Sequence, residues 1–397
     1  MDRVGVIFAG VAISALGAMT YNLLPLFLGT AQDFRALSDQ SVGILGSSFY
    51  AGFTLATITA YFWIRRCSWR VVSFSAIPIA AGALVAAGLT QSYLLMAIAI
   101  AVAGGAFSVL YGIGTTVLGD TSRPARWYGL KIASEAGLGA ILLLILPGTV
   151  IQRWGFTGLM AAMAIVLLVL SPLLAGLPAR GSKGAEPTAD RQEAALAPAL
   201  RFALWLGLAA VLVYLFCTTM IWAFVERVAN DAGFDAVATG NVLSLSLVLA
   251  ICGSLAAMVL GDRFGLALPL TVAASLLLAS LVLLGGMDSL ATYAVATCLF
   301  TFSFGLGIPY TVSVVADLDV DGRFVVLTVP AIGIGVMLAP ALGGILTGIG
   351  GHAVLLMTGA VSVLIALALA LLALRMGLPH ARAHRHRAGG EPAEPIV

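Results

Sequence analysis

The sequence predicts an all-α integral membrane protein with twelve transmembrane helices, arranged as two pseudo-symmetric six-helix halves. Composition is the first observation behind this prediction: of 397 residues, 61% are hydrophobic and only 10% are charged, whereas soluble domains carry roughly 25% charged residues. Twelve membrane-spanning helices of about 20 residues need about 240 apolar residues, and 61% of the chain is about 242. The composition argues against a β-barrel, whose strands alternate polar and apolar residues in segments of about ten.

The second observation is a series of twelve long apolar runs. Because lipid offers no hydrogen-bond partner to an open backbone, runs of this length are expected to be helical. The first run begins at Val4 and lacks a small-residue cleavage site, so we expect a retained helix rather than a signal peptide. The runs lie at about 4–30, 40–63, 71–90, 93–118, 127–150, 155–177, 202–225, 236–260, 266–286, 289–314, 324–349 and 353–374.

The positions of lysine and arginine predict the orientation in the membrane. Sixteen of these residues fall on the termini and the even-numbered connections, and three (Arg35, Arg153 and Arg227) fall on the odd-numbered connections. Positive residues are enriched on the cytoplasmic side. We therefore expect a multi-pass protein of the cell inner membrane with both termini in the cytoplasm.

Polar segments divide the chain into predicted units. Residues 178–200 are rich in Pro, Gly and charge and are expected to be a cytoplasmic linker. It would separate an N-terminal six-helix bundle, 1–177, from a C-terminal one, 201–375. Residues 376–397 form a polar, basic tail that we expect to be disordered. The three histidines of this tail could bind a metal, but a basic tail that anchors the last helix is the favoured interpretation, and no metal site is predicted.

An internal repeat is the third observation. A shift of 195 residues superimposes FSVLYGIGTTV at 107–117 on FSFGLGIPYTV at 302–312, with six identities. A shift of 196 aligns Gly155 with Gly351, and a shift of 197 aligns Gly43 with Gly240. Ordered matches at a nearly constant shift indicate two halves in parallel orientation, as in secondary transporters.

This layout resembles the major facilitator superfamily of secondary transporters. The loop Gly261-Asp262-Arg263-Phe264-Gly265 is similar to that family's G-x-x-x-D-R-x-G signature. The resemblance implies a cytoplasmic gate formed by Arg66, Asp262 and Arg263, although the first-half loop around Arg66 lacks the Asp and both glycines. The family's proton-driven drug exporters usually carry an Arg in helix 4, and the run 93–118 has none.

Glu135 and Lys131 are the only ionised residues inside a predicted span. A charge near mid-membrane costs about 2.5–3.5 kcal/mol on the insertion scale, so Glu135 is expected to be paired, protonated or exposed to water. We predict a proton-coupling role for both residues. Three alternatives remain: a static Lys131–Glu135 pair on one helical face, contact of the Lys131 ammonium group with an anionic substrate such as a monocarboxylate, and extension of Lys131 to the cytoplasmic membrane surface.

Uncharged polar residues in the spans are candidates for substrate binding, since an apolar cavity with a few polar groups suits a small organic solute. Each could instead be a partner in helix–helix packing. The candidates are Tyr21, Asn22, Tyr111, Thr115, Tyr214, Thr218, Trp222, Asn241, Ser303 and Tyr310. Glu226 and Arg227, at the periplasmic end of the seventh span, are expected to form a solvated pair, with a role in a gate as the alternative.

These features predict a secondary active transporter that moves a small neutral or monoanionic organic solute by alternating access, coupled to protons. The alternatives are a proton-driven exporter of drugs or metabolites and a transporter-like membrane sensor that moves no solute. No histidine-based or other catalytic cluster lies within a span, so no enzymatic activity is expected. The predicted partners are the solute, protons and the lipid bilayer; no cofactor or nucleic acid is predicted.

Overall fold

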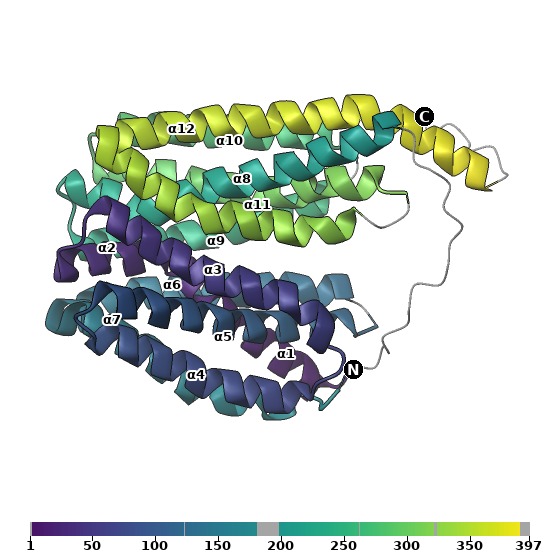
Figure 1. Ribbon diagram of the computed structural model, residues 1–397. Helices are drawn as coiled ribbons and strands as arrows, with labels where there is room; N and C mark the ends of the chain where they lie inside the picture. Colours follow the sequence, from purple (N-terminus) through teal and green to yellow (C-terminus); the bar gives the residue numbers. More distant parts are fainter. Residues whose placement is uncertain (1, 123, 181–197, 262, 321–323, 390–397) are drawn as a thin grey trace.

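The computed structural model of the protein describes residues 2–122, 124–180, 198–261, 263–320 and 324–389. Within these ranges the chain is almost entirely helical and contains no strand. The helices run roughly alongside one another (Figure 1). We call the end where α1 begins the terminal end, and the opposite end, where α2 leads into α3, the distal end.

The helices of the first half follow one another with short connections. They are α1 (Val4–Asn22), α2 (Leu24–Arg35), α3 (Asp39–Trp63), α4 (Trp69–Leu89), α5 (Tyr93–Gly119), α6 (Pro124–Leu146), the π-helix η1 (Pro147–Ile151), α7 (Gln152–Leu170) and the 3-10 helix η2 (Ser171–Gly176). The first predicted run is interrupted between α1 and α2, at Leu23. Pro25 lies at the start of α2, where its missing N–H leaves no helical bond unmade.

The second half has fewer but longer helices. They are α8 (Pro198–Asp231), α9 (Ala236–Leu260), α10 (Ala267–Gly285), α11 (Leu290–Leu318), the 3-10 helix η3 (Val325–Leu327) and α12 (Thr328–Gly389). The predicted linker therefore gives way to helix at Pro198, since proline is well suited to the first turn of a helix. Residues 181–197 of the linker lie outside the described residues.

Ten continuous helical stretches of the described residues are long and apolar enough to span a membrane. Two of them are each broken into two spans, which gives twelve crossings. Two of these stretches contain a glycine in a left-handed conformation, Gly155 (φ 53°) in one and Gly351 (φ 65°) in the other. Gly343 and Gly359, on either side of the second break, both lie against residues 220–224 of α8, whereas Gly377 lies near Ala203. The chain therefore reverses direction there. The pairing of Gly155 with Gly351 in the sequence repeat is confirmed.

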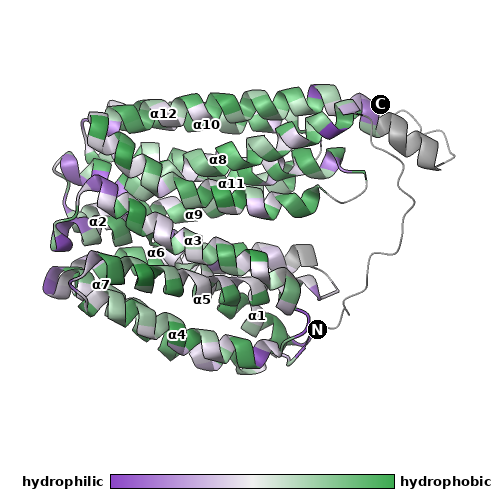
Figure 2. Ribbon diagram, in the orientation of Figure 1, coloured by the Kyte–Doolittle hydropathy of each residue, from purple (hydrophilic) through white to green (hydrophobic). Residues whose placement is uncertain are grey.

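The outer surface of the bundle is apolar. Large side chains such as Leu55, Val282 and Ile349 are 65%, 75% and 76% exposed. Apolar residues cover the lengths of the helices, and polar residues gather at their ends (Figure 2). A surface of this kind is stable only in contact with lipid tails, in accordance with the predicted membrane protein.

Glycine allows the closest helix crossings, and a similar crossing occurs once in each half. A Cβ atom placed on Gly52 of α3 would overlap the carbonyl oxygen of Ala101, and one on Gly104 of α5 would overlap that of Phe49. In the second half, a Cβ atom on Gly253 of α9 would overlap the carbonyl oxygen of Phe302, and one on Gly305 of α11 would overlap that of Ala250. All four residue numbers differ by 201 between the halves. The repeats found in the sequence of these helices differ by 195 and 197, so the second crossing lies six residues further along α11 and four further along α9 than strict repetition would place it. Small residues permit such backbone contact in membranes, where the hydrophobic effect does not hold helices together.

The C-terminal segment differs from the prediction. Residues 376–389, expected to be disordered, continue α12 as far as Gly389. Much of this segment consists of alanine and arginine, which favour helix. This helix propensity outweighs the tendency of a polar segment to be disordered. Residues 390–397 lie outside the described residues.

Replacement of Gly253 by alanine should destabilise the protein by about 1–3 kcal/mol, because the added methyl group meets backbone rather than a movable side chain. Gly82→Ala is the matched control, since no atom lies within 4 Å of the position of its Cβ. Thermal unfolding of the full-length protein in detergent measures the effect. Equal melting temperatures for the two variants would show that the crossing is not tight.

Candidate functional site

A charged cluster lies halfway along α6 and includes the two ionised residues singled out from the sequence. Lys131 Nζ is 2.7 Å from Glu135 Oε1, and Ser14 Oγ of α1 donates a hydrogen bond of 2.5 Å to the same oxygen. Lys131 Nζ also lies 4.0 Å from the centre of the Tyr111 ring of α5, a cation–π contact. Three helices therefore meet at these four residues, which we call the charged cluster.

Burial distinguishes the charged cluster from a surface ion pair. The Lys131 and Glu135 side chains are only 6% and 12% exposed. The ammonium group therefore does not extend to the membrane surface, and that interpretation of Lys131 is wrong for this conformation. The two charges neutralise each other, which offsets part of their desolvation. Ser14 was missed in the sequence; its only signal was a hydroxyl within the apolar first run.

Asn22 and Tyr21 lie where α1 ends, between the charged cluster and the second half. Asn22 Nδ2 donates to the backbone oxygen of Glu135, at 2.8 Å. The backbone oxygen of Tyr21 accepts a 3.1 Å hydrogen bond from Trp222 Nε1 of α8. The Tyr21 ring stacks on Phe304 of α11, with centroids 6.4 Å apart. Tyr21 and Trp222 thus join the two halves in the middle of the membrane.

The remaining candidate in the first half is engaged within its own helix. Thr115 Oγ1 donates to the backbone oxygen of Tyr111 at 2.9 Å. This bond to a carbonyl four residues earlier is a common way for a threonine to satisfy its hydroxyl in a helix. Thr115 therefore lies one turn from the charged cluster and bonds to the backbone of Tyr111, not to a side chain of the cluster.

The candidates of the second half do not gather around the charged cluster. Tyr214 donates to the backbone oxygen of Ser303 at 3.2 Å, and Tyr310 to that of Gly261 at 2.9 Å. The hydroxyls of Thr218 and Ser303 donate to carbonyls of their own helices, at 2.8 and 2.6 Å. These four side chains are buried, and the two tyrosine hydroxyls link α8 to α11 and α11 to the end of α9. Asn241 is exposed.

The predicted gate residues lie at the terminal end. Arg66 and Arg263 are both exposed, and Asp262 lies outside the described residues. Arg65, next to Arg66, forms a bidentate pair with Asp120, at 2.7 and 2.9 Å. The Asp120 side chain is 1% exposed, so the pair fastens the end of α3 to the end of α5. One signal in the sequence could have indicated this pair, an acidic residue two positions after the end of the fourth apolar run.

The distal end carries a network that the sequence did not predict. Arg227 of α8 lies 2.9 Å from Asp33 of α2 and 2.9 Å from Asp231, and Asn230 donates to Asp33 at 3.2 Å. Glu226 is only 7% exposed, and its carboxylate lies directly against Gly29 of α2. The expected solvated pair of Glu226 and Arg227 is therefore wrong: one residue is buried between the halves and the other forms an ion pair across them.

Two symmetric glycine contacts extend the packing of the halves from the distal end toward the middle. A Cβ atom on Gly43 of α3 would overlap the backbone oxygen of Pro340 of α12. One on Gly240 of α9 would lie 2.7 Å from that of Leu143 of α6. Both residue pairs differ by 197, the shift that aligned Gly43 with Gly240 in the sequence.

The charged cluster lies on the terminal side of this packing. Along η1 and α6, the contact with α9 extends from Gly148 to Gly139, whose Cβ position is 2.9 Å from Leu247. Glu135 is four residues further toward the terminal end, about 6 Å along the helix. The inter-half contacts named here lie at the distal end, where α2 and α7 are seen in Figure 1, and in the middle of the bundle.

Removal of either charge of the cluster should destabilise the protein by about 3–5 kcal/mol, because the partner is left buried and unpaired. We expect Lys131→Met and Glu135→Gln each to lower the melting temperature, and the double variant to recover most of the loss. Arg263→Gln, an exposed position, is the control for loss of one charge. Additive losses in the double variant would contradict a coupled pair.

Gly43→Ala should weaken the packing of the halves at the distal end, because the methyl group meets the Pro340 carbonyl. Spin labels at Ala36 and Ala236, in the α2–α3 connection and at the start of α9, would report this as a new population at longer distances. Gly137→Ala is the control, since its Cβ position has no atom within 4 Å. An unchanged distance distribution for Gly43→Ala would show that closure does not depend on this contact.

Comparisons with known proteins agree with this architecture. No curated protein sequence matches the chain significantly. Two crystal structures of a bacterial homolog of the human lysosomal transporter Spinster are similar in fold. The inward-facing, unoccupied one has a TM-score of 0.65 at 14% identity and covers 98% of both chains. The inward-facing, occupied one has a TM-score of 0.66 at 17% identity, with 94% of this chain and 97% of that chain covered. The family profile of the Major Facilitator Superfamily matches residues 7–322, most of the chain, and the protein therefore belongs to this family of transporters.

Proposed function

We propose that the protein is a secondary transporter that moves a small neutral or monoanionic organic solute by alternating access and is coupled to protons. The observation that carries this proposal is the charged cluster. A carboxylate and an ammonium group are paired inside the bundle, next to the region where the two halves meet. A pair that served only to hold helices together could be replaced by apolar side chains without loss of stability.

Charge balance supplies a mechanism for the coupling. With Glu135 ionised, the cluster is neutral as a whole. Protonation of Glu135 leaves the Lys131 ammonium as the only charge beside the Tyr111 ring, and a bound monoanion would restore neutrality. A net charge inside the membrane is costly, so states with both proton and solute, or with neither, are favoured. Joint movement of one proton with one monoanion follows, and a single lysine does not suit a polyanion.

The positions of the candidate residues suggest the substrate contacts. Tyr111 lies against Lys131, and Tyr21 and Trp222 lie where the halves meet. We assign solute contact to these three, with Asn22 orienting the backbone at Glu135. The buried candidates of the second half would stabilise the packing of its helices and would not contact the solute. They are Tyr214, Thr218, Ser303 and Tyr310.

Alternating access requires the distal packing to open when the solute is exchanged on the other side. The Arg227–Asp33 pair and the glycine contacts at Gly43 and Gly240 are the interactions that would break. If the termini are cytoplasmic, as the distribution of lysine and arginine predicts, the present arrangement is closed to the outside of the inner membrane. Arg66 and Arg263, with Asp262, would then act at the cytoplasmic gate.

The test of the coupling is gradient-driven transport by Glu135→Gln. A thermal-shift screen of neutral and monoanionic solutes first identifies a ligand, since a hundredfold excess over Kd stabilises the folded state by about 2.7 kcal/mol. In proteoliposomes, a gradient of one pH unit should then raise wild-type accumulation about tenfold, because one unit corresponds to about 1.4 kcal/mol. Glu135→Gln should retain solute exchange but lose the dependence on the gradient.

Asp288→Asn, an exposed carboxylate outside the bundle, is the control and should transport as the wild type does. Unchanged gradient dependence in Glu135→Gln would refute the coupling role. Binding without transport by the wild type would favour the sensor instead.

A further inference from the structure

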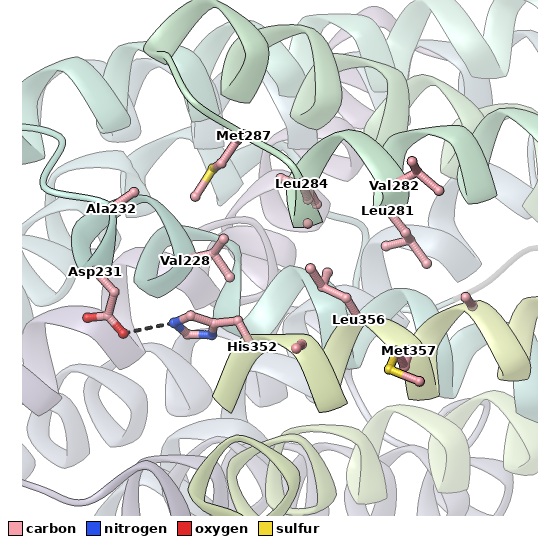
Figure 3. Close-up of a pocket in the computed structure, with 13 residues that line it drawn as sticks. Val228, Asp231, Ala232, Leu281, Val282, Leu284, Met287, His352, Leu356 and Met357 are labelled. Atoms are coloured by element: carbon pink, nitrogen blue, oxygen red, sulfur yellow. Dashed lines mark hydrogen bonds and ion pairs between the residues drawn. The ribbon is translucent and has the colours of Figure 1, made fainter. Parts of the chain in front are cut away.

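A groove opens on the surface of the second half at the distal end, between α8, α10 and α12. Its volume is about 490 Å³. Figure 3 shows Leu281, Val282, Leu356 and Met357 along it, with Asp231 and His352 at one end. Val282 and Met357 are 75% and 68% exposed, so the groove faces the lipid and not the region between the two halves. It is separate from the charged cluster.

The dimensions of the groove match one leaflet of a bilayer. Its polar end lies at the level where α8 ends, at Asp231, and where α10 ends, at Gly285. From His352 to Ala360 the lining follows α12 for about 12 Å at 1.5 Å per residue. Half of a hydrocarbon core of about 30 Å is about 15 Å. Because the groove is apolar and opens to the membrane, a lipid acyl chain is the natural material to fill it.

The polar end of the groove offers hydrogen-bond acceptors. Asp231 already accepts from Arg227 and pairs with His352, whose Nε2 is 2.8 Å from its Oδ2. Its side chain is still 43% exposed, and a carboxylate has sites for further donors. When the neutral His352 ring donates from Nε2, its Nδ1 carries a lone pair, and this atom is buried without a partner among the described residues.

The charge around this end is acidic on balance, because one cation, Arg227, is shared between the carboxylates of Asp33 and Asp231. A further carboxylate follows directly after Met287, which lines the groove, at Asp288. The hydroxyls of Thr292 and Ser289 hold the pKa of Asp288 below its usual range, so this carboxylate is ionised at neutral pH. A ligand for this end must therefore donate hydrogen bonds and carry positive charge, which excludes an exposed phosphate or carboxylate as the contacting group.

We propose that this groove binds a phospholipid with a primary ammonium headgroup, phosphatidylethanolamine, with one acyl chain between α10 and α12 and the ammonium group at Asp231. Phosphatidylcholine has the same charges but no N–H donor, and phosphatidylglycerol lacks the cation. The headgroup, rather than the acyl chain, is therefore the source of selectivity. This proposal does not depend on the proposed transport function.

The experiment is native mass spectrometry of the full-length protein in detergent micelles that contain equal amounts of the three lipids with identical acyl chains. We expect phosphatidylethanolamine adducts to exceed the other two about tenfold, the effect of one hydrogen bond to a charged group. Asp231→Asn should abolish the preference over phosphatidylcholine. Equal retention of the three lipids by the wild type, or a preference for phosphatidylglycerol, would overturn the proposal.

A second set of variants tests the acyl-chain site. Ala360→Phe and Ala353→Phe each place a ring in the groove and should reduce phosphatidylethanolamine adducts about tenfold, as expected for loss of several buried methylene groups. Ala368→Phe is the matched control, because Ala368 is exposed on the same helix outside the groove lining. An equal loss of phosphatidylethanolamine adducts in Ala368→Phe would overturn the assignment to this groove. Because both Ala353→Phe and Ala360→Phe are measured, the test still holds if one of them misfolds.

Discussion

Close contact between helix backbones is the constraint on which this structure depends. An apolar side chain gains no hydrophobic free energy when it moves from lipid tails to a neighbouring helix, because both are apolar. Close packing and hydrogen bonds must therefore hold the bundle together. Glycine permits the nearest approach, and it occupies the crossings inside both halves, at Gly52 and Gly253. Glycine also occupies the two contacts that close the distal end, at Gly43 and Gly240. The same kind of contact thus builds each half and joins the two halves.

Hydrogen bonds accompany the close contacts both inside each half and between the halves. Within a half, the glycine crossings are accompanied by hydrogen bonds such as that from Thr301 to the backbone of Ser246, at 2.6 Å. Between the halves, some polar contacts lie inside the bundle, such as the hydrogen bond from Trp222 to the backbone of Tyr21. Others lie near water, as with the Arg227–Asp33 pair, whose side chains are 24% and 41% exposed. Exposed ion pairs contribute little free energy, so this pair adds little to the joint between the halves.

The charged cluster sits beside that joint, and its neutrality as a unit explains its position. Lys131 and Glu135 would each be costly alone in this environment, whereas together they neutralise each other. Ser14 and Tyr111 come from two other helices of the same half. None of these contacts crosses the joint between the halves.

Composition, apolar runs and the repeat were enough to predict the helical membrane fold, its twelve crossings and the pairing of Gly155 with Gly351, because lipid restricts a spanning chain to helices of nearly fixed length. The i, i+4 spacing likewise predicted the contact between Lys131 and Glu135. Only the tertiary structure revealed that Ser14 joins that pair, that Arg65 rather than Arg66 binds Asp120, and that Arg227 reaches Asp33. Each of these contacts depends on how two helices are rotated and offset, which hydropathy does not encode. A hydroxyl in a helix can also satisfy itself on a carbonyl one turn earlier, as Thr218 and Ser303 do, so its residue type alone does not distinguish a packing role from a binding one.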